Sequence, residues 1–294
     1  MEEPSPRSSR IALAGAVAAA LVVGGAGFLL GRGTTERTQI VVAPPVAAPT
    51  PKPAPDPSPL RGVLGRSDLV ALAAAAADAA AAGRAPGPEI AAADGRRFEV
   101  RLPFGCSGPA GEGSNAAMRW RYEADDQALR IQVSPMIWTA QDWWEGDAPA
   151  GIDAIEGFWI TRPWTSSEDC PVAADRAMAA GVEPVTLPGQ TLALGQTFSA
   201  EGARGGRRDG EAYQAVIRVP EEDLRTADGF RLRISGRIAR IPNGGPVRCR
   251  QPAGSEQRPI CLVGMVVDEI AIENPATEET LATWSVARRE AGEN

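Results

Sequence analysis

Apolar and polar residues alternate with a period of two over much of the chain after residue 97. Such alternation predicts β-strands with one buried face and one face in water. The segments that show it are 98–102, 118–122, 129–133, 213–219 and 230–238. Residues 260–267 are nearly all apolar, which predicts a strand covered on both faces.

Turn-type sequences such as PFGCSGPAGEGSN and PNGGP separate these segments. Gly236 interrupts one of them and predicts a β-bulge. Residues 279–286 fit either a last strand or a short helix, and 172–180 fit a short helix. About eight strands without alternating helices predict a mainly β domain over residues 90–290, either an antiparallel β-sandwich or a partly open barrel.

A different pattern precedes this domain. Residues 11–30 form an uncharged apolar run, IALAGAVAAALVVGGAGFLL, whose helical length of roughly 30 Å matches a bilayer core. The alternative is a cleaved signal peptide, which has a basic start, a shorter apolar stretch and a small-residue cleavage site. Here Glu2 and Glu3 lie in the 1–10 tail and GRGTTER follows the run. We therefore predict a single transmembrane anchor at 11–31.

Small residues share one face of this predicted anchor. They recur at spacings of three and four residues and would let two helices approach closely. A homodimer through this face is one hypothesis, and chance spacing in an Ala/Gly-rich helix is the alternative. The four residues are Ala20, Gly24, Gly27 and Gly31.

A Pro/Ala-rich linker at 32–66 follows the anchor. Its prolines favour extended polyproline II, and residues 44–59 alone would span roughly 50 Å. The linker predicts a stalk that lifts the domain off the bilayer, and the alternative is a ligand for a proline-recognising module.

An Ala-rich helix is predicted at 67–84, with Ser67 or Asp68 as its N-cap and Gly83 at its end. Its larger apolar residues lie near the first turn only, so we expect it to bury little surface. It either docks on the following domain or pairs with a second copy.

Four cysteines lie in or beside loop-type sequence, at successive spacings of 64, 79 and 12 residues. These spacings do not form a zinc motif, and no metal site is predicted. We predict the disulfides Cys249–Cys261, between two successive strands, and Cys106–Cys170, between two turns. Disulfides indicate an oxidising compartment. The alternative is four reduced cysteines in a cytosolic domain.

The amino-acid composition limits the catalytic mechanisms and metal sites that the chain can have. The chain has no histidine, and its 30 basic residues are 29 arginines and Lys52, which lies in the linker. This excludes histidine-based triads, bases and zinc sites, and lysine-based catalysis in the folded domain. Residues 111–116 match the spelling G-x-G-x-x-A, but a strand instead of a helix follows them, so no dinucleotide site is predicted. No catalytic residue and no cofactor is assigned.

The charge of the domain argues against nucleic acid as a partner. Six of 30 basic and four of 37 acidic residues precede residue 63, which leaves 24 and 33 in the remainder, a net charge of −9. Arginines at outward strand positions predict a solvated face with ion pairs, and an anion-binding stripe is the alternative. These arginines are Arg119, Arg121, Arg130, Arg231, Arg233, Arg237 and Arg240.

Five of the seven tryptophans lie between residues 138 and 164. Neighbouring Trp143 and Trp144 cannot both point into one core if the chain is extended there, so we expect one of them to be exposed. Trp138, Trp143 and Trp144 are the candidate contact residues for a sugar or a peptide, and the alternative is that most of these rings are core.

Acidic residues cluster at 125–126, 168–169 and 221–223. A glycoside hydrolase uses two facing carboxylates, so a carboxylate-based glycan hydrolase is an alternative function. Residues 221–223 also fit the first turn of a short helix.

The order of tail, anchor, stalk and β-rich domain is similar in layout to bacterial envelope proteins, including energy-transducing and cell-division proteins. This analogy of layout covers residues 1 to about 65, is carried by no motif of the domain, and implies a single-pass protein of the inner membrane. The predicted disulfides favour a periplasmic C-terminal domain. Basic residues lie on both sides of the anchor and do not fix its orientation. We predict a non-enzymatic binding or assembly module that contacts an envelope protein or cell-wall glycan. Besides the glycan hydrolase, a cytosolic-facing β-domain remains an alternative.

Overall fold

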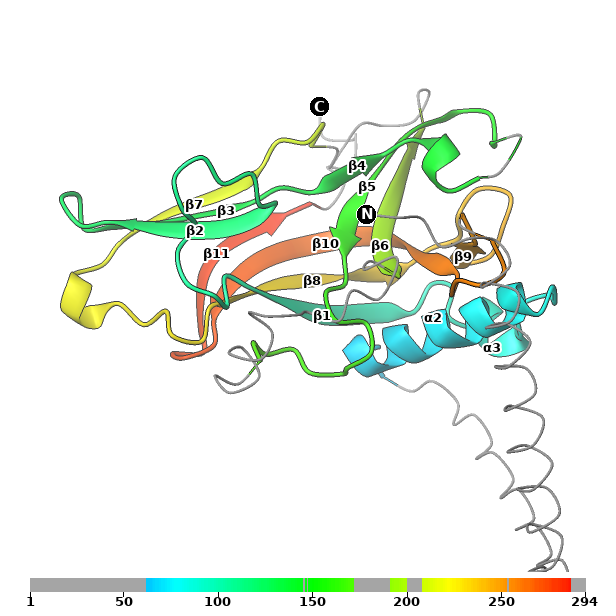
Figure 1. Ribbon diagram of the computed structural model, residues 1–294, viewed down its shortest axis with the longest axis horizontal. Helices are drawn as coiled ribbons and strands as arrows, with labels where there is room; N and C mark the ends of the chain where they lie inside the picture. Colours follow the sequence, from blue (N-terminus) through cyan, green and yellow to red (C-terminus); the bar gives the residue numbers. More distant parts are fainter. Residues whose placement is uncertain are drawn as a thin grey trace, which may run out of the picture. The chain divides into compact units, whose positions relative to one another are not determined.

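The computed structural model describes residues 62–144, 146, 148–171, 191–199, 208–252 and 254–286 (Figure 1). The predicted anchor, its small-residue face, nearly all of the linker and the helix predicted at 172–180 lie outside these residues. No helix within the described ranges is both long and apolar enough to cross a bilayer.

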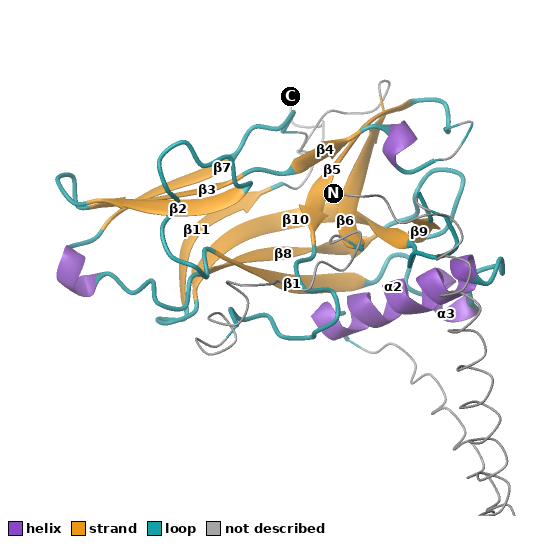
Figure 2. Ribbon diagram, viewed as in Figure 1, coloured by secondary structure: helices purple, strands orange, loops and turns teal. Residues whose placement is uncertain are grey.

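Strands are the main regular secondary structure of the described chain (Figure 2). The helices are α2 (Arg66–Ala81) and α3 (Pro88–Ala91), with 3₁₀ turns η1 (Ala140–Asp142) and η2 (Glu221–Asp223). The strands are β1 (Arg97–Phe104), β2 (Met118–Glu123), β3 (Ala128–Val133), β4 (Met136–Trp138), β5 (Ile152–Trp159), β6 (Leu192–Ser199), β7 (Tyr213–Arg218), β8 (Phe230–Ile238), β9 (Val247–Arg250), β10 (Ile260–Asn274) and β11 (Glu279–Ser285).

The strands form two sheets, and the protein is mainly β as predicted. The larger sheet has eight strands in the order β1-β8-β10-β6-β5-β4, with β9 and β11 also paired to β10. The smaller sheet has the order β2-β3-β7. Among the strand pairs of the described residues only β6–β10 is parallel, so the expectation of antiparallel pairing fails for that pair. The 279–286 segment, which fitted a strand or a helix, is strand β11.

The 15-residue strand β10 carries the larger sheet. Its first part pairs with β9 and β6, and its second part pairs with β8 and β11. Cys261 and Val263 belong to the core cluster that includes α2, whereas Ile260 and Leu262 belong to a second cluster of tryptophans. Both faces of this apolar run are therefore covered, as its composition predicted.

The two sheets pack through aromatic rings. Trp120 of β2 meets Phe230 of β8 edge-to-face, with ring centroids 5.7 Å apart. Tyr213 of β7 meets Trp284 of β11 at 5.3 Å. Edge-to-face pairs of this kind add to the free energy gained by burying the rings. The inward-facing residues of the smaller sheet thus belong to the same hydrophobic core as those of the larger sheet.

Helix α2 docks on the domain, and the expectation that it buries little is wrong. Leu69 and Leu72 are buried, as are Ala73, Ala76, Ala77 and Ala79. Alanine allows close approach to the sheet: the Cys261 Sγ atom lies 3.6 Å from the carbonyl oxygen of Ala73. The large apolar residues alone underestimate this surface, because most of the buried face of α2 is alanine.

The start of α2 also differs from the prediction. The N-cap is Gly65 and not Ser67 or Asp68, because the helix begins at Arg66. Asp68 instead accepts a hydrogen bond from the Gly65 N–H, at 2.9 Å. At the other end Gly83 adopts φ +61°, the left-handed conformation expected there.

Arg66 is only 2 % exposed and connects α2 to the segment after β5. Its guanidinium donates to the carbonyl oxygens of Thr161, Arg162 and Thr165, and more distantly, at 3.5 Å, to that of Arg101. Burial, followed by the charge of Arg162, lowers the pKa of Arg66 to about 10, so the side chain remains charged at neutral pH.

The outer edge of β1 is covered. Leu64 exchanges backbone hydrogen bonds of 2.8 and 2.9 Å with Arg97 and Glu99. Further along, the Arg101 N–H donates to the Glu168 carboxylate at 3.0 Å. Covering an edge in this way prevents it from pairing with another chain.

The bulge predicted at Gly236 lies on the partner strand. Strand β8 runs through Gly236, and the register shifts in β10 between Val267 and Glu269. The two backbones approach closely here, because a Cβ atom built on Gly236 would overlap the carbonyl oxygen of Val266. Glycine, which has no Cβ atom, is therefore the residue that fits between the two backbones at this position.

We therefore expect Gly236→Ala to destabilise the protein by about 1–3 kcal/mol, since the added methyl group must separate β8 from β10. Urea unfolding of the full chain in a neutral detergent, followed by tryptophan fluorescence, measures this loss. Gly245→Ala is the control, because nothing lies within 4 Å of a Cβ atom there. Equal unfolding midpoints for the two variants would contradict the close approach.

Candidate functional site

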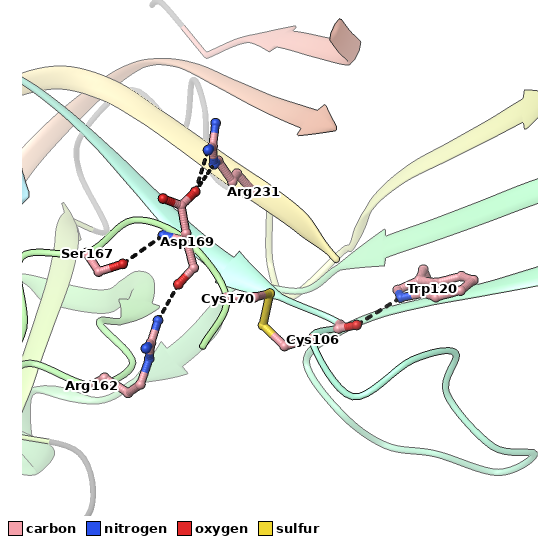
Figure 3. Close-up of a disulfide and its surroundings, with 8 residues drawn as sticks. Cys106, Trp120, Arg162, Ser167, Asp169, Cys170 and Arg231 are labelled. Atoms are coloured by element: carbon pink, nitrogen blue, oxygen red, sulfur yellow. Dashed lines mark hydrogen bonds and ion pairs between the residues drawn. A yellow bond between two sulfur atoms is a disulfide. The ribbon is translucent and has the colours of Figure 1, made fainter. Parts of the chain in front are cut away.

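A glycine-rich loop, residues 105–117, connects β1 to β2 and is held at several points. The Cys106–Cys170 disulfide joins its start to the segment after β5, and the Trp120 indole N–H donates to the Gly105 carbonyl oxygen at 3.3 Å (Figure 3). The Ala110 N–H donates to the Trp120 carbonyl oxygen at 2.8 Å. The loop therefore lies along the outer edge of the smaller sheet.

A pocket of about 410 Å³ lies between this loop and the outer face of the smaller sheet. We name it the arginine pocket. The strand register sets its floor: Arg119, Gln132 and Gln214 form one row across β2, β3 and β7, and Arg121, Arg130 and Val216 form the next. Ala110, Gly111, Gly113 and Ser114 of the loop complete the lining.

The arginine pocket has three guanidinium groups in its lining and no carboxylate. At one end, Glu123 pairs with Arg130 at 2.6 Å and with Arg121 at 3.3 Å. Arg119 instead donates to the Ala116 carbonyl oxygen at 2.6 Å and to the Gln132 side-chain oxygen at 2.8 Å. Among the described residues Arg119 has no acidic partner.

The arginines of β1 and β8 are different, because they form the ion-paired face that the sequence predicted. Arg233 pairs with Glu273 at 2.6 Å and with Glu269 at 2.9 Å, and Arg101 pairs with Glu273 at 2.8 Å. Burial alone would lower the pKa of Arg101, but its hydrogen bond to Glu273 and the nearby carboxylates raise it. Arg231 pairs with Asp169 (Figure 3).

The candidate tryptophans lie in a buried cluster. Trp143 is 1 % exposed and Trp144 is 6 % exposed, so the interpretation of these rings as core is confirmed and the expectation of an exposed contact ring at 143 or 144 is wrong. Trp138 packs edge-to-face against Trp143 and Trp159, with centroids 5.6 and 5.3 Å apart. The Arg248 guanidinium lies 4.5 Å from the ring centre of Trp144.

The local turn explains this difference. The N–H groups of Trp143 and Trp144 both donate to the carbonyl oxygen of Ala140, so the chain is coiled after η1 and not extended. Both rings can then pack on the larger sheet. The exposed tryptophan is Trp164, at 51 %, which the sequence did not distinguish.

None of the three pockets lined by described residues contains a residue of the three acidic clusters. Glu168 bonds to Arg101 of β1 and Asp169 to Arg231 of β8, and Asp126 lies 3.8 Å from Arg130. Glu221–Asp223 form the 3₁₀ turn η2, at the place where their sequence also fitted a short helix. Of two further pockets, one has a single carboxylate in its lining, that of Glu156, and the other has no carboxylate. Within the described ranges no three His, Cys, Asp or Glu side chains are grouped to hold a metal ion.

Comparison of the chain with protein-family models, with curated proteins and with solved structures gave no significant match. The arginine pocket was missed from the sequence because it depends on the pairing of β3 with β7, which are about 80 residues apart in the chain. The only sequence signal was the outward position of Arg119, Arg121 and Arg130.

The tryptophan cluster predicts a contrast between two variants. Trp143→Ala should cost about 3–5 kcal/mol of stability, because it removes a fully buried ring. Trp164→Ala should cost clearly less, because half of its side chain is already in water. Urea unfolding of both full-length variants measures the difference, and an unchanged midpoint for Trp143→Ala would refute a core role for that ring.

Proposed function

We propose that this chain is a single-pass, membrane-anchored binding module of the bacterial envelope. Its β-sandwich domain lies on the periplasmic side of the inner membrane, beyond the anchor at 11–31 and the stalk at 32–66. The module is non-enzymatic, and it binds a partner through the arginine pocket.

The observation that carries the location is the pairing of the cysteines. Cys106 bonds to Cys170 and Cys249 bonds to Cys261, the two pairs that the sequence predicted. Disulfides persist in oxidising compartments such as the periplasm and are reduced in the cytosol. Two disulfides are compatible with a translocated domain and disfavour the cytosolic alternative with reduced cysteines.

The composition of the pocket favours binding over catalysis. A glycan hydrolase uses a pair of carboxylates roughly 5–10 Å apart on either side of the scissile bond. The arginine pocket has guanidinium, amide and hydroxyl groups in its lining and no carboxylate. Such groups recognise anions and polar groups through hydrogen bonds, and none of them is a general acid or base at neutral pH.

The location is tested by counting thiols. The full chain is expressed in a Gram-negative bacterium and denatured without reductant. We expect that none of its four cysteines then reacts with a maleimide reagent, and that all four react after reduction. The Cys249→Ser variant should expose one reactive thiol, Cys261, because its disulfide partner is gone. Four reactive thiols before reduction would overturn the periplasmic location.

Binding is tested by site-directed photocrosslinking in cells. A photoreactive amino acid in place of Val216, which is 54 % exposed and lines the arginine pocket, should give a discrete crosslinked product. The matched control is Val266, which is 43 % exposed on the larger sheet. The same products at both positions, or no product at Val216, would contradict a binding function for this pocket.

A further inference from the structure

We infer that the arginine pocket binds a carboxylate-bearing peptide segment of a partner protein. This inference rests on the proposed function and specifies the chemistry of its ligand. The pocket recognises glutamate or aspartate side chains through Arg119 and the neighbouring guanidinium groups.

The charge of the pocket lining favours an acidic ligand. Three arginines and no acid line the pocket, and of these three arginines Arg121 and Arg130 have carboxylate partners among the described residues, whereas Arg119 has none. Arg119 is already oriented by two neutral acceptors, Ala116 and Gln132. A planar guanidinium that is held in position binds a carboxylate through paired, charge-assisted hydrogen bonds. An acidic group is the ligand that completes this arrangement.

The rest of the lining suits a peptide. Gln132 and Gln214 lie in the same row as Arg119, and their amide groups can both donate to and accept from a peptide backbone. The exposed side chain of Val216 provides an apolar contact beside them. The volume of about 410 Å³ lies in the range of small ligand sites and suits a short segment better than a folded surface.

Glycans and nucleic acids fit this pocket less well. Both are commonly bound by stacking a ring on an exposed aromatic side chain. The aromatic residue in the lining is Trp120, which is 4 % exposed and packs toward the core. The net charge of −9 over residues 63–294 also opposes a polyanionic partner that would contact a large part of the surface.

The test uses the full chain in a neutral detergent and two fluorescein-labelled hexapeptides, (Gly-Glu)₃ and (Gly-Gln)₃, followed by fluorescence anisotropy. We expect the Glu peptide to bind at least about tenfold more tightly than the Gln peptide, and rising NaCl concentration to weaken it. Equal affinities for the two peptides would overturn the inference. So would tighter binding of a sulfated oligosaccharide that displaces the Glu peptide.

Variants connect the binding to the pocket. Arg119→Gln should weaken the Glu peptide about tenfold, the loss expected from one charge-assisted hydrogen-bonded pair. Arg119→Lys should be intermediate, because it keeps the charge and loses the paired geometry. The matched control is Arg240→Gln, whose side chain is 64 % exposed and pairs with Asp94 away from the pocket. An equal loss for Arg240→Gln would show non-specific attraction and overturn the site.

Three further outcomes separate the ligand class from the proposed function. If Arg119→Gln lowers the unfolding midpoint, Gly111→Asp replaces it: this change adds a negative charge where nothing lies within 4 Å of a Cβ atom, and it should also weaken the Glu peptide. If the Glu peptide does not bind but the Val216 photocrosslink persists, the ligand class is wrong and the binding module stands. If both fail, the proposed function fails as well.

Discussion

The rest of the structure depends on one strand whose two faces and two edges are all used. Strand β10 has 15 residues, and four strands share its edges. Its first part has helix α2 on one face and the tryptophan cluster on the other. The register shift after Val267 separates this part from the second, where Ile270 and Ile272 contribute to the core and Glu269 and Glu273 meet arginines. A bulge allows one strand to belong to two differently covered regions.

This arrangement supports the arginine pocket from beneath. The smaller sheet is joined to the larger one by the Trp120–Phe230 and Tyr213–Trp284 contacts, so its inner face is fixed and its outer face is available. The glycine-rich loop over the outer face is attached through Cys106 to the segment after β5, and Arg66 of α2 bonds to the same segment. The loop that lines the pocket is thus attached both to the smaller sheet and, through a disulfide, to a segment beside the larger sheet.

Local patterns predicted much of the fold, and long-range contacts account for most of what they missed. The period of two located β1, β2, β3, β7 and β8. The expected pairing of two successive strands predicted Cys249–Cys261, and the position of two cysteines in turns predicted Cys106–Cys170. The burial of Trp143 could not be predicted, because it depends on a coiled turn at Ala140 and on the face of β10 that the ring meets. The burial of α2 was missed since alanines contribute little surface each and become a docking face only against a suitable sheet.

The absence of histidine acquires a physical meaning at the arginine pocket. A pocket lined by histidine would gain or lose charge between about pH 5 and 8. A guanidinium keeps its charge throughout that range. Salt, by contrast, screens an exposed charge pair at any pH. Under the proposed function, the attraction of Arg119, Arg121 and Arg130 for an acidic ligand is therefore expected to weaken as the ionic strength rises.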